Sequence, residues 1–333
     1  MLTAAAIADD LTGALEMGAL FAAHGLRCAV MLELREAAPQ LEAVVYDTES
    51  RHLHAKEAAL KVRQASALIS SKVAPRYVFK KIDSTMRGNV VPEAVALSEA
   101  FGGRSVLLTP AYPAMGRTVS QGMLYVRGVP IAETSFGRDP LSPVADSNIG
   151  KLFTTSRVQL ADVETDEDLK QIADSGGQLL AGSGGLGRIW VEGLKRGSYT
   201  GEMKGHVQDP MLICGSAHPV SRAQAEAARS RGVRVIATPE QMLSPLETSD
   251  RFGQEAMDEI QKRRPDLLII FGGETAYRLL RRMRVSVMRP QGEVLPGLPL
   301  SIIQSGGEEM MVVTKAGGFG EASVVKEILE ELR

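Results

Sequence analysis

The sequence contains few of the residues that build disulfide frameworks, metal centres or membrane spans. Its only two cysteines, Cys28 and Cys214, lie far apart in apolar runs, which predicts reduced, packed thiols. His52 and His54 have no supporting Cys or third His at ligand spacing, so we expect no protein-held metal. No apolar run approaches the length of a bilayer span, and two aspartates interrupt the apolar start where a signal peptide would have its core. We therefore expect a cytoplasmic protein.

The sequence also lacks an excess of charge of either sign. Its 38 Lys and Arg nearly balance its 40 Asp and Glu, which gives a formal net charge of −2. No overall field attracts nucleic acid or an anionic membrane, so we expect neither as a partner and predict a small molecule instead. A homodimer is one arrangement open to such a chain, and the sequence does not decide it. A length of 333 residues favours two domains over one.

Short apolar runs alternate with stretches of helical periodicity, first along residues 3–109 and again from residue 211. This pattern predicts an α/β protein with two domains, each a mostly parallel sheet flanked by helices. Between residues 110 and 143 the alternation stops in a Pro- and Gly-rich run. There we expect a structureless functional loop or lid, with a hairpin around Arg127 and Gly128. The polar segment 196–209 is the predicted linker, so the predicted domains are 1–205 and 206–333, with the active site in the cleft between them.

Residues 80–89 (KKIDSTMRGN) place two lysines, a carboxylate, hydroxyls and a guanidinium where a short strand meets a helix. Ligands of open α/β sheets bind at such strand ends. Arg or Lys could pair with an acid group while Asp and Ser bind hydroxyls, as a polyhydroxy acid requires. The candidates are Lys81, Asp83, Ser84 and Arg87. We expect Lys80 to face away, because neighbouring residues of a strand point to opposite faces. The alternative is a solvated edge with a surface ion pair.

Asp9 and Asp10 end the first predicted strand and are candidates for acid–base chemistry. One could face the crevice while Asp10 or Thr12 caps the following helix. The alternative is that both carboxylates only cap the helix or contact solvent.

Three later strands run into loops that contain glycine, at Gly215-Ser216, at Gly272-Gly273 and at residues 317–320. If the strands are parallel, these loops lie at one edge, where backbone N–H groups and helix N-termini could cradle nucleotide phosphates. The alternative is that the glycines only make tight turns. His218, in the first loop, could contact phosphate or cap the helix. No G-x-x-x-x-G-K-S/T motif is present, so the site is not a P-loop.

An ordered set of motifs resembles the four-carbon acid sugar kinase family, which includes 3-oxo-tetronate, D-threonate and D-erythronate kinases. The main stretches are 7–14 (IADDLTGA), 80–89, 110–118 (PAYPAMGRT), 272–275 (GGET) and 315–320 (KAGGFG). Each motif is weak alone, but the ordered set spans nearly the whole chain. Gln121, where Asn is expected, and Ile82, where Val or Thr is usual, depart from the family pattern, and the chain is shorter than many members.

The resemblance implies an N-terminal domain that binds the sugar acid and a C-terminal domain that binds ATP, with transfer of the γ-phosphoryl group to the terminal hydroxyl. Mg²⁺ would accompany ATP. Asp10 is the first candidate for the catalytic base, with Asp9 and Asp83 as rivals. Lys81, Ser84, Arg87 and Arg117 would hold the substrate. The expected nucleotide-binding residues are Ser216, Gly272, Gly273, Glu274, Lys315, Gly317 and Gly318.

Two other functions are compatible with the residues. A lyase or aldolase could use Lys81 as a Schiff base if its pKa were lowered. A sensor could bind a sugar acid or nucleotide without turnover. The sequence does not rank the four-carbon acids.

Overall fold

A computed structural model of the chain describes residues 2–139, 142–175, 178–201, 207–216, 218–238 and 245–332. The chain forms two compact units, Met1–Ser198 and Tyr199–Arg333. Both residues that flank the predicted boundary, 205 and 206, lie outside the described residues. None of the described helices is long and apolar enough to cross a bilayer.

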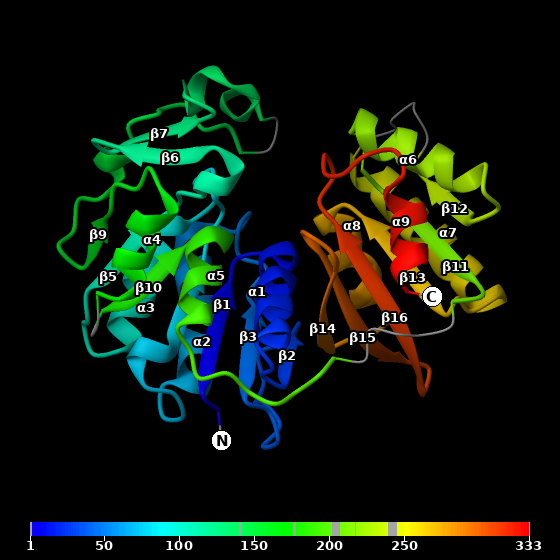
Figure 1. Cartoon of the computed structure of the whole chain (residues 1–333), viewed down its shortest axis with the longest axis horizontal. Helices are drawn as coiled ribbons and strands as arrows, with labels where there is room; N and C mark the ends of the chain where they lie inside the picture. Colours follow the sequence, from blue (N-terminus) through cyan, green and yellow to red (C-terminus); the bar gives the residue numbers. More distant parts are fainter. Residues whose placement is uncertain are drawn as a thin grey trace. The chain divides into compact units, whose positions relative to one another are not determined.

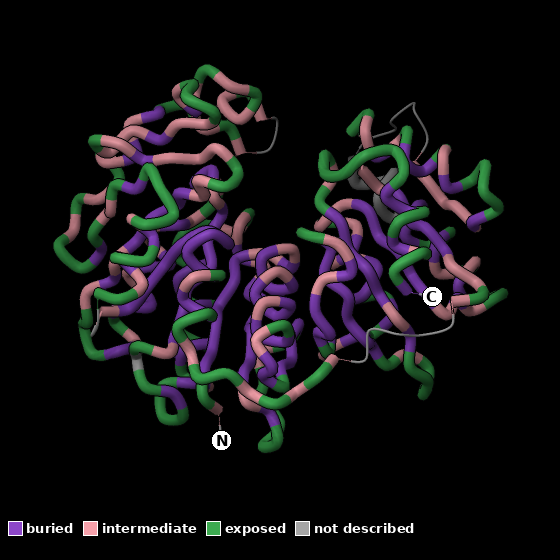
Figure 2. Tube along the Cα trace, viewed as in Figure 1, coloured by how far each residue is buried: buried purple, intermediate pink, exposed green. Residues whose placement is uncertain are grey.

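The first unit is built on seven parallel strands in the order β2-β3-β1-β4-β10-β5-β9. Their burial on both faces explains why the sequence shows continuous apolar runs rather than alternation (Figure 2). The strands are β1 (Ala4–Ala8), β2 (Cys28–Met31), β3 (Ala43–Asp47), β4 (Val78–Lys81), β5 (Val106–Thr109), β9 (Val158–Leu160) and β10 (Leu179–Gly182). The helices are α1 (Leu11–Ala23), α2 (Ala55–Ile69), α3 (Val90–Ala100), α4 (Asp166–Ala173) and α5 (Gly184–Glu192).

The insert after β5 is not structureless, so that prediction is wrong. It forms a three-stranded antiparallel sheet of β6 (Arg117–Ser120), β7 (Met123–Val126) and β8 (Val129–Pro130). The predicted hairpin is confirmed: Val126 pairs with Val129 around Arg127 and Gly128, which both have positive φ. Short 3-10 helices follow at Ile131–Glu133, Ser135–Arg138 and Ile149–Leu152. Figure 1 shows this small sheet beyond the carboxyl ends of the large sheet's strands.

The described residues of the second unit form a sheet with the strand order β12-β11-β13-β16-β15-β14. Strands β11, β12, β13 and β16 are parallel, whereas β14 and β15 extend the sheet as an antiparallel meander. The strands are β11 (Pro210–Cys214), β12 (Arg234–Ala237), β13 (Leu267–Phe271), β14 (Val287–Leu295), β15 (Leu298–Ser305) and β16 (Glu308–Lys315). The helices are α6 (Pro219–Arg229), α7 (Pro245–Lys262), α8 (Gly273–Arg282) and α9 (Val324–Glu331). The prediction of two mostly parallel α/β sheets flanked by helices is confirmed (Figure 1). Cys28 and Cys214 are buried free thiols, as predicted.

Candidate active site

The loops after β1 and β4 leave two neighbouring parallel strands of the first unit. Lys80 and Lys81 of β4 are adjacent, so their side chains point to opposite faces of the sheet. Lys81 Nζ lies 3.0 Å from Glu16 of α1, and Lys80 Nζ lies 2.7 Å from Glu93 of α3. Helices α1 and α3 therefore cover opposite faces. In open α/β sheets, a crevice opens where the helices next to two adjacent strands cover opposite faces of the sheet. Ligands bind in this crevice. Lys80 is completely buried, so the alternative that these lysines form a solvated edge is excluded.

Arg51 is the centre of the charge arrangement at this edge. Its Nε and Nη2 donate to Asp9 at 2.7 and 3.1 Å, its Nη1 lies 2.7 Å from Asp10 Oδ2, and its Nη2 lies 4.0 Å from Asp83. One guanidinium thus joins all three predicted acid–base candidates. Asp10 also accepts from the backbone N–H of Gly13 at 2.8 Å, so it caps α1.

The three aspartates differ in pKa because burial and cations compete differently at each. Burial favours the neutral form of Asp9, but Arg51 and Lys80 outweigh it, and the pKa of Asp9 is lowered. At Asp83, burial is outweighed by Arg87 and Arg51, and the pKa is far below its usual range. Burial and the charge of Asp9 instead raise the pKa of Asp10, despite Arg51 and Lys81. Asp10 also has the most exposed side chain, at 18% against 4% for Asp9 and 10% for Asp83.

Asp83 and Arg87 form an ion pair. Arg87 donates to Asp83 from Nε and Nη2 at 2.9 and 3.0 Å, and its Nη1 lies 3.4 Å from Asp139. Asp83 also accepts from the backbone N–H and hydroxyl of Thr85. Both predicted residues therefore shape the loop that follows β4, and Arg87 has two carboxylate partners of its own.

Arg117, from β6, differs from Arg87 in its hydrogen-bond partners. Its Nη1 donates to the hydroxyl of Ser84 at 2.5 Å, and its buried Nε has no hydrogen-bond partner among the described residues. Among the described residues no carboxylate pairs with it. Burial lowers the pKa of Arg117, which shows that neighbouring carboxylates do not compensate its desolvation. Its guanidinium lies 5.8 Å from the ring centre of Phe136. Of the predicted substrate-binding cations, Lys81 and Arg87 have carboxylate partners, whereas Arg117 has none within the part of the chain that the structure describes.

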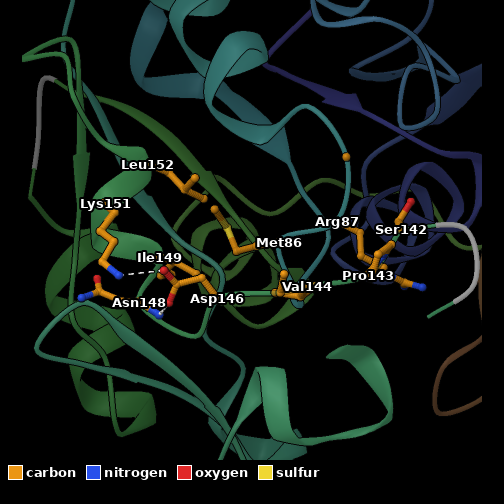
Figure 3. A pocket seen from close by; sticks show the side chains of 12 residues that line it. Met86, Arg87, Ser142, Pro143, Val144, Asp146, Asn148, Ile149, Lys151 and Leu152 are labelled. Carbon is orange, nitrogen blue, oxygen red and sulfur yellow. Dashed lines mark hydrogen bonds and ion pairs between the residues drawn. The ribbon is translucent and has the colours of Figure 1, made fainter. Parts of the chain in front are cut away.

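A pocket of about 400 Å³ lies beside the same loop (Figure 3). Its wall combines residues 86–88 with residues 142–146, 148–149 and 151–152 of the insert. Met86 has a φ of 62° and points toward Leu152 in Figure 3, while Lys151 and Asp146 pair at 2.8 Å. Arg87 is the one predicted site residue that lines this pocket. The pocket is thus a neighbour of the Arg117–Ser84 pair rather than its enclosure.

In the second unit, the loops that follow β11, β13 and β16 meet at one edge of the parallel part of the sheet. A Cβ on Gly317 would lie 2.7 Å from Ser216 Oγ, and one on Gly318 would lie 3.0 Å from His218 Nε2. A Cβ on Gly272, which has a φ of 106°, would lie 3.7 Å from the backbone nitrogen of Ser216. The predicted convergence of the three glycine loops is therefore confirmed. His218 caps α6 by accepting from Val220.

Lys315 and Gln224 hold the last of these loops by its carbonyls. Lys315 Nζ donates to the carbonyls of residues 316, 317 and 319 at 2.9, 3.1 and 2.9 Å. Gln224 Nε2 donates to the carbonyls of residues 319–321, each at 2.9 Å. By contrast, the N–H groups of Gly317, Gly318 and Gly320 donate to no acceptor in the described part of the chain. A loop whose carbonyls are engaged and whose N–H groups find no acceptor among the described residues could accept an anion.

Two family models match the chain in the same arrangement. One is described as a sugar-binding N-terminal domain and matches residues 4–157; the other is a nucleotide-binding C-terminal domain and matches residues 253–325. The chain belongs to the four-carbon acid sugar kinase family. It is therefore a phosphotransferase with an alcohol group as acceptor, as the motifs predicted.

Several curated relatives of this kinase family align with almost all of the chain. A D-threonate kinase from Bordetella bronchiseptica is 27% identical, covering 98% of this chain and 96% of the relative. A 3-oxo-tetronate kinase from Pseudomonas fluorescens is 24% identical over the same shares. A solved structure of a Haemophilus influenzae protein superimposes with a TM-score of 0.75 at 17% identity, covering 99% of this chain and 100% of that chain, and so supports the fold.

A kinase of this family takes its phosphoryl group from a nucleotide, and Mg²⁺ would bind together with that nucleotide. The described residues contain no group of three or more His, Cys, Asp or Glu that could hold a metal ion alone. Mg²⁺ usually binds through one or two carboxylates together with substrate phosphates, so such a group is not required. Glu274 is the predicted residue that could supply an oxygen, although it pairs with Arg278 at 2.5 Å.

Sequence reasoning missed several residues of the kinase's charged edge. Arg51 contacts all three candidate acids, Glu16 and Glu93 neutralise the two lysines, and Gln224 holds the glycine loop. A signal for Arg51 was present: the polar run 48–51 directly follows the buried strand β3, as Asp9 and Asp10 follow β1. No sequence signal pointed to Gln224, because nothing in the sequence distinguishes a helical glutamine that binds a loop from one that does not.

Proposed function

We propose that the chain transfers the γ-phosphoryl group of ATP to the terminal hydroxyl of a four-carbon sugar acid, with ATP bound in the second unit and the acid in the first. The observation that carries this proposal is Arg117, a partly buried guanidinium with no carboxylate partner among the described residues and with the Ser84 hydroxyl beside it. A carboxylate with neighbouring hydroxyls supplies the missing charge and the hydrogen bonds. Lys81 and Arg87 surround the site but are already paired.

Asp10 is the proposed base for the attacking hydroxyl. A general base works best when its pKa approaches the working pH, and among the three aspartates only Asp10 has a raised pKa. Arg51 and Gly13 fix its orientation. Asp9 then serves to hold Arg51, and Asp83 to hold Arg87.

The glycine loops of the second unit are the proposed site for the nucleotide phosphates. Ser216, Gly272, Gly273, Gly317 and Gly318 would supply hydrogen-bond donors and close backbone approach, and the N-termini of α6 and α8 would add positive potential. Lys315 would act mainly through the loop, because its ammonium already binds three carbonyls. Mg²⁺ would neutralise the phosphates when bound with ATP.

The Schiff-base alternative for Lys81 loses its support. Such a lysine needs a lowered pKa. Burial would lower the pKa of Lys81, but Glu16, Asp10 and Asp9 outweigh burial and raise it. The sensor alternative conflicts with membership of a kinase family. A site between the two domains and a homodimer stay predictions.

An ADP-release assay across D-threonate, D-erythronate and 3-oxo-tetronate with Mg²⁺ and ATP tests the proposal. Arg117→Gln should raise KM for the preferred acid by about tenfold or more with a smaller effect on KM for ATP. Arg138→Gln, an exposed arginine of the same insert, is the matched control. Silence of the wild type on every acid would contradict the proposed substrate class, and equal KM values for the two variants would refute the role of Arg117.

A further inference from the structure

The ion pair between Lys80 and Glu93 is buried beneath the candidate active site of the first unit. Their side chains are 0% and 1% exposed, and Nζ lies 2.7 Å from Oε2. Desolvation makes such a pair a poor source of stability, and hydrophobic replacement of similar volume is often neutral or stabilising. The proposed phosphoryl transfer does not use either residue directly. The pair therefore calls for another explanation.

The hydrogen bonds from Glu93 lead to the charged edge. Glu93 Oε1 accepts from Ser50 Oγ at 2.6 Å, and Ser50 Oγ lies 2.7 Å from Thr48 Oγ1. Thr48 Oγ1 donates to the carbonyl of Ala8 at 2.7 Å, while the Ser50 N–H donates to the carbonyl of Asp9 at 2.9 Å. A continuous buried chain thus connects α3 to the backbone on either side of Asp9 and to the residue before Arg51.

A second contact from the start of α3 holds the same loop. Asn89 Nδ2 donates to the carbonyls of Ser50 and Leu53 at 3.0 and 2.8 Å. A Cβ on Gly88 would lie 2.9 Å from Arg51 Cγ, so the backbone of residue 88 packs directly on Arg51. Asn89 therefore holds this loop through its backbone carbonyls, and Glu93 holds it through the hydroxyl of Ser50.

We propose that Glu93, fixed by Lys80 and acting through Ser50, is a positioning residue that locks Arg51 against Asp9 and Asp10. Without this lock, the 48–51 loop would be free to shift, and the guanidinium would no longer hold the two carboxylates in one geometry. Because the effect on chemistry passes through Asp10, the inference rests on the proposed function. Lys80 has a second effect, since its charge helps to lower the pKa of Asp9.

Ser50→Ala tests the lock because it breaks the connection and leaves the ion pair intact. Ser98→Ala is the matched control: Ser98 lies in the same helix as Glu93, is equally buried, and donates to the Arg104 carbonyl at 2.7 Å away from the site. We expect Ser50→Ala to lower kcat by roughly 10- to 100-fold with KM for ATP unchanged, because small misplacements of catalytic groups have effects of this size. Ser98→Ala should stay within about twofold of the wild type. Equal kcat values for the two variants overturn the inference.

The double variant Lys80→Met/Glu93→Leu removes the charges while filling the volume. The inference predicts an unchanged or higher melting temperature together with a lower kcat. A loss of activity that only follows a loss of folded protein contradicts it. This variant decides the question if Ser50→Ala does not fold.

A measurement without turnover separates this inference from the proposed function. Carboxyl NMR titration should show a higher pKa for Asp9 in Ser50→Ala than in the wild type, because Arg51 is released, and no change in Ser98→Ala. If the wild type turns over no acid, the proposed function fails and this titration still decides the lock. Identical Asp9 titrations in all three proteins overturn it.

Discussion

The backbone N–H of Gly13 donates to Asp10 Oδ1 at 2.8 Å, and a Cβ on Gly13 would lie 3.0 Å from the same oxygen. That Cβ would also lie 3.2 Å from Lys81 Nζ. Glycine at this position therefore lets the proposed base and a neighbouring ammonium approach the first turn of α1. Any side chain would displace one of them.

Gly13→Ala should separate activity from stability. Alanine inside a helix is intrinsically more favourable than glycine by about 0.5–1 kcal/mol, so the melting temperature should hold or rise. We expect kcat to fall about tenfold or more because Asp10 is displaced. Gly193→Ala is the control, since its Cβ would meet nothing closer than 3.5 Å. Full activity of Gly13→Ala would show that Asp10 tolerates displacement and is not the base.

Asp10→Asn should reduce kcat by about 100-fold or more, the usual effect of removing a general base. Asparagine also caps helices well, so α1 should persist and the melting temperature should change little. The raised pKa of Asp10 places the acidic limb of the wild-type pH–rate profile above the ordinary aspartate value of 3.8, and the variant should lose that limb.

Asp83→Asn provides the contrast, because Asp83 holds Thr85 and Arg87 in place. It should lower the melting temperature more than Asp10→Asn does. Unchanged turnover in Asp10→Asn with complete loss in a folded Asp83→Asn would reverse the assignment of the base.

Lys315 should make stability depend on pH above neutrality. Burial lowers its pKa from 10.5 to about 8. Between these values the unfolded chain binds more protons than the folded one, so this residue's contribution to stability rises with pH from about 8 to 10.5. Below that window both states are protonated and the contribution is flat.

The measurement is the difference in unfolding free energy between the wild type and Lys315→Met, taken from urea melts at several pH values. We expect the unfolding free energy of the wild type to increase relative to that of the variant as the pH rises through this window. Lys326→Met, at an exposed lysine of α9, is the control. Parallel curves for Lys315→Met would show that the ammonium is not desolvated.

Gln121, the departure from the family pattern, lies in the turn between β6 and β7 with a φ of 51°. Asp162 accepts from the N–H groups of Gln121 and Gly122 at 2.7 and 3.0 Å. Asparagine tolerates this left-handed conformation better than glutamine does. Gln121→Asn should therefore raise stability by about 0.5–1 kcal/mol without changing kcat. Thermal melts and initial rates check both parts, with Gln121→Ala expected to give no gain.

The sequence predicts the parallel strands and the position of the site because buried strands read as apolar runs and parallel strands gather their loops at one edge. It does not predict strand β14, in which Pro290 and Gly292 interrupt the pattern; the pairing with β15 shifts register between them. The sequence also does not predict which Lys and Arg side chains pair with a carboxylate. Lys81, Arg87 and Arg117 look equivalent in the sequence, and only the fold shows that Arg117 has no carboxylate partner among the residues that the structure describes.

Phosphorus NMR of the reaction mixture tests the central claim most directly. Transfer to the terminal hydroxyl places phosphate on a CH₂ group, so the product should give a phosphomonoester signal split into a triplet by two protons. It should appear together with ADP, depend on the sugar acid, and be strongly reduced in Arg117→Gln and Asp10→Asn. A doublet would place the phosphate on a secondary hydroxyl. Release of inorganic phosphate alone, or no consumption of ATP with any four-carbon acid, would contradict the proposed reaction.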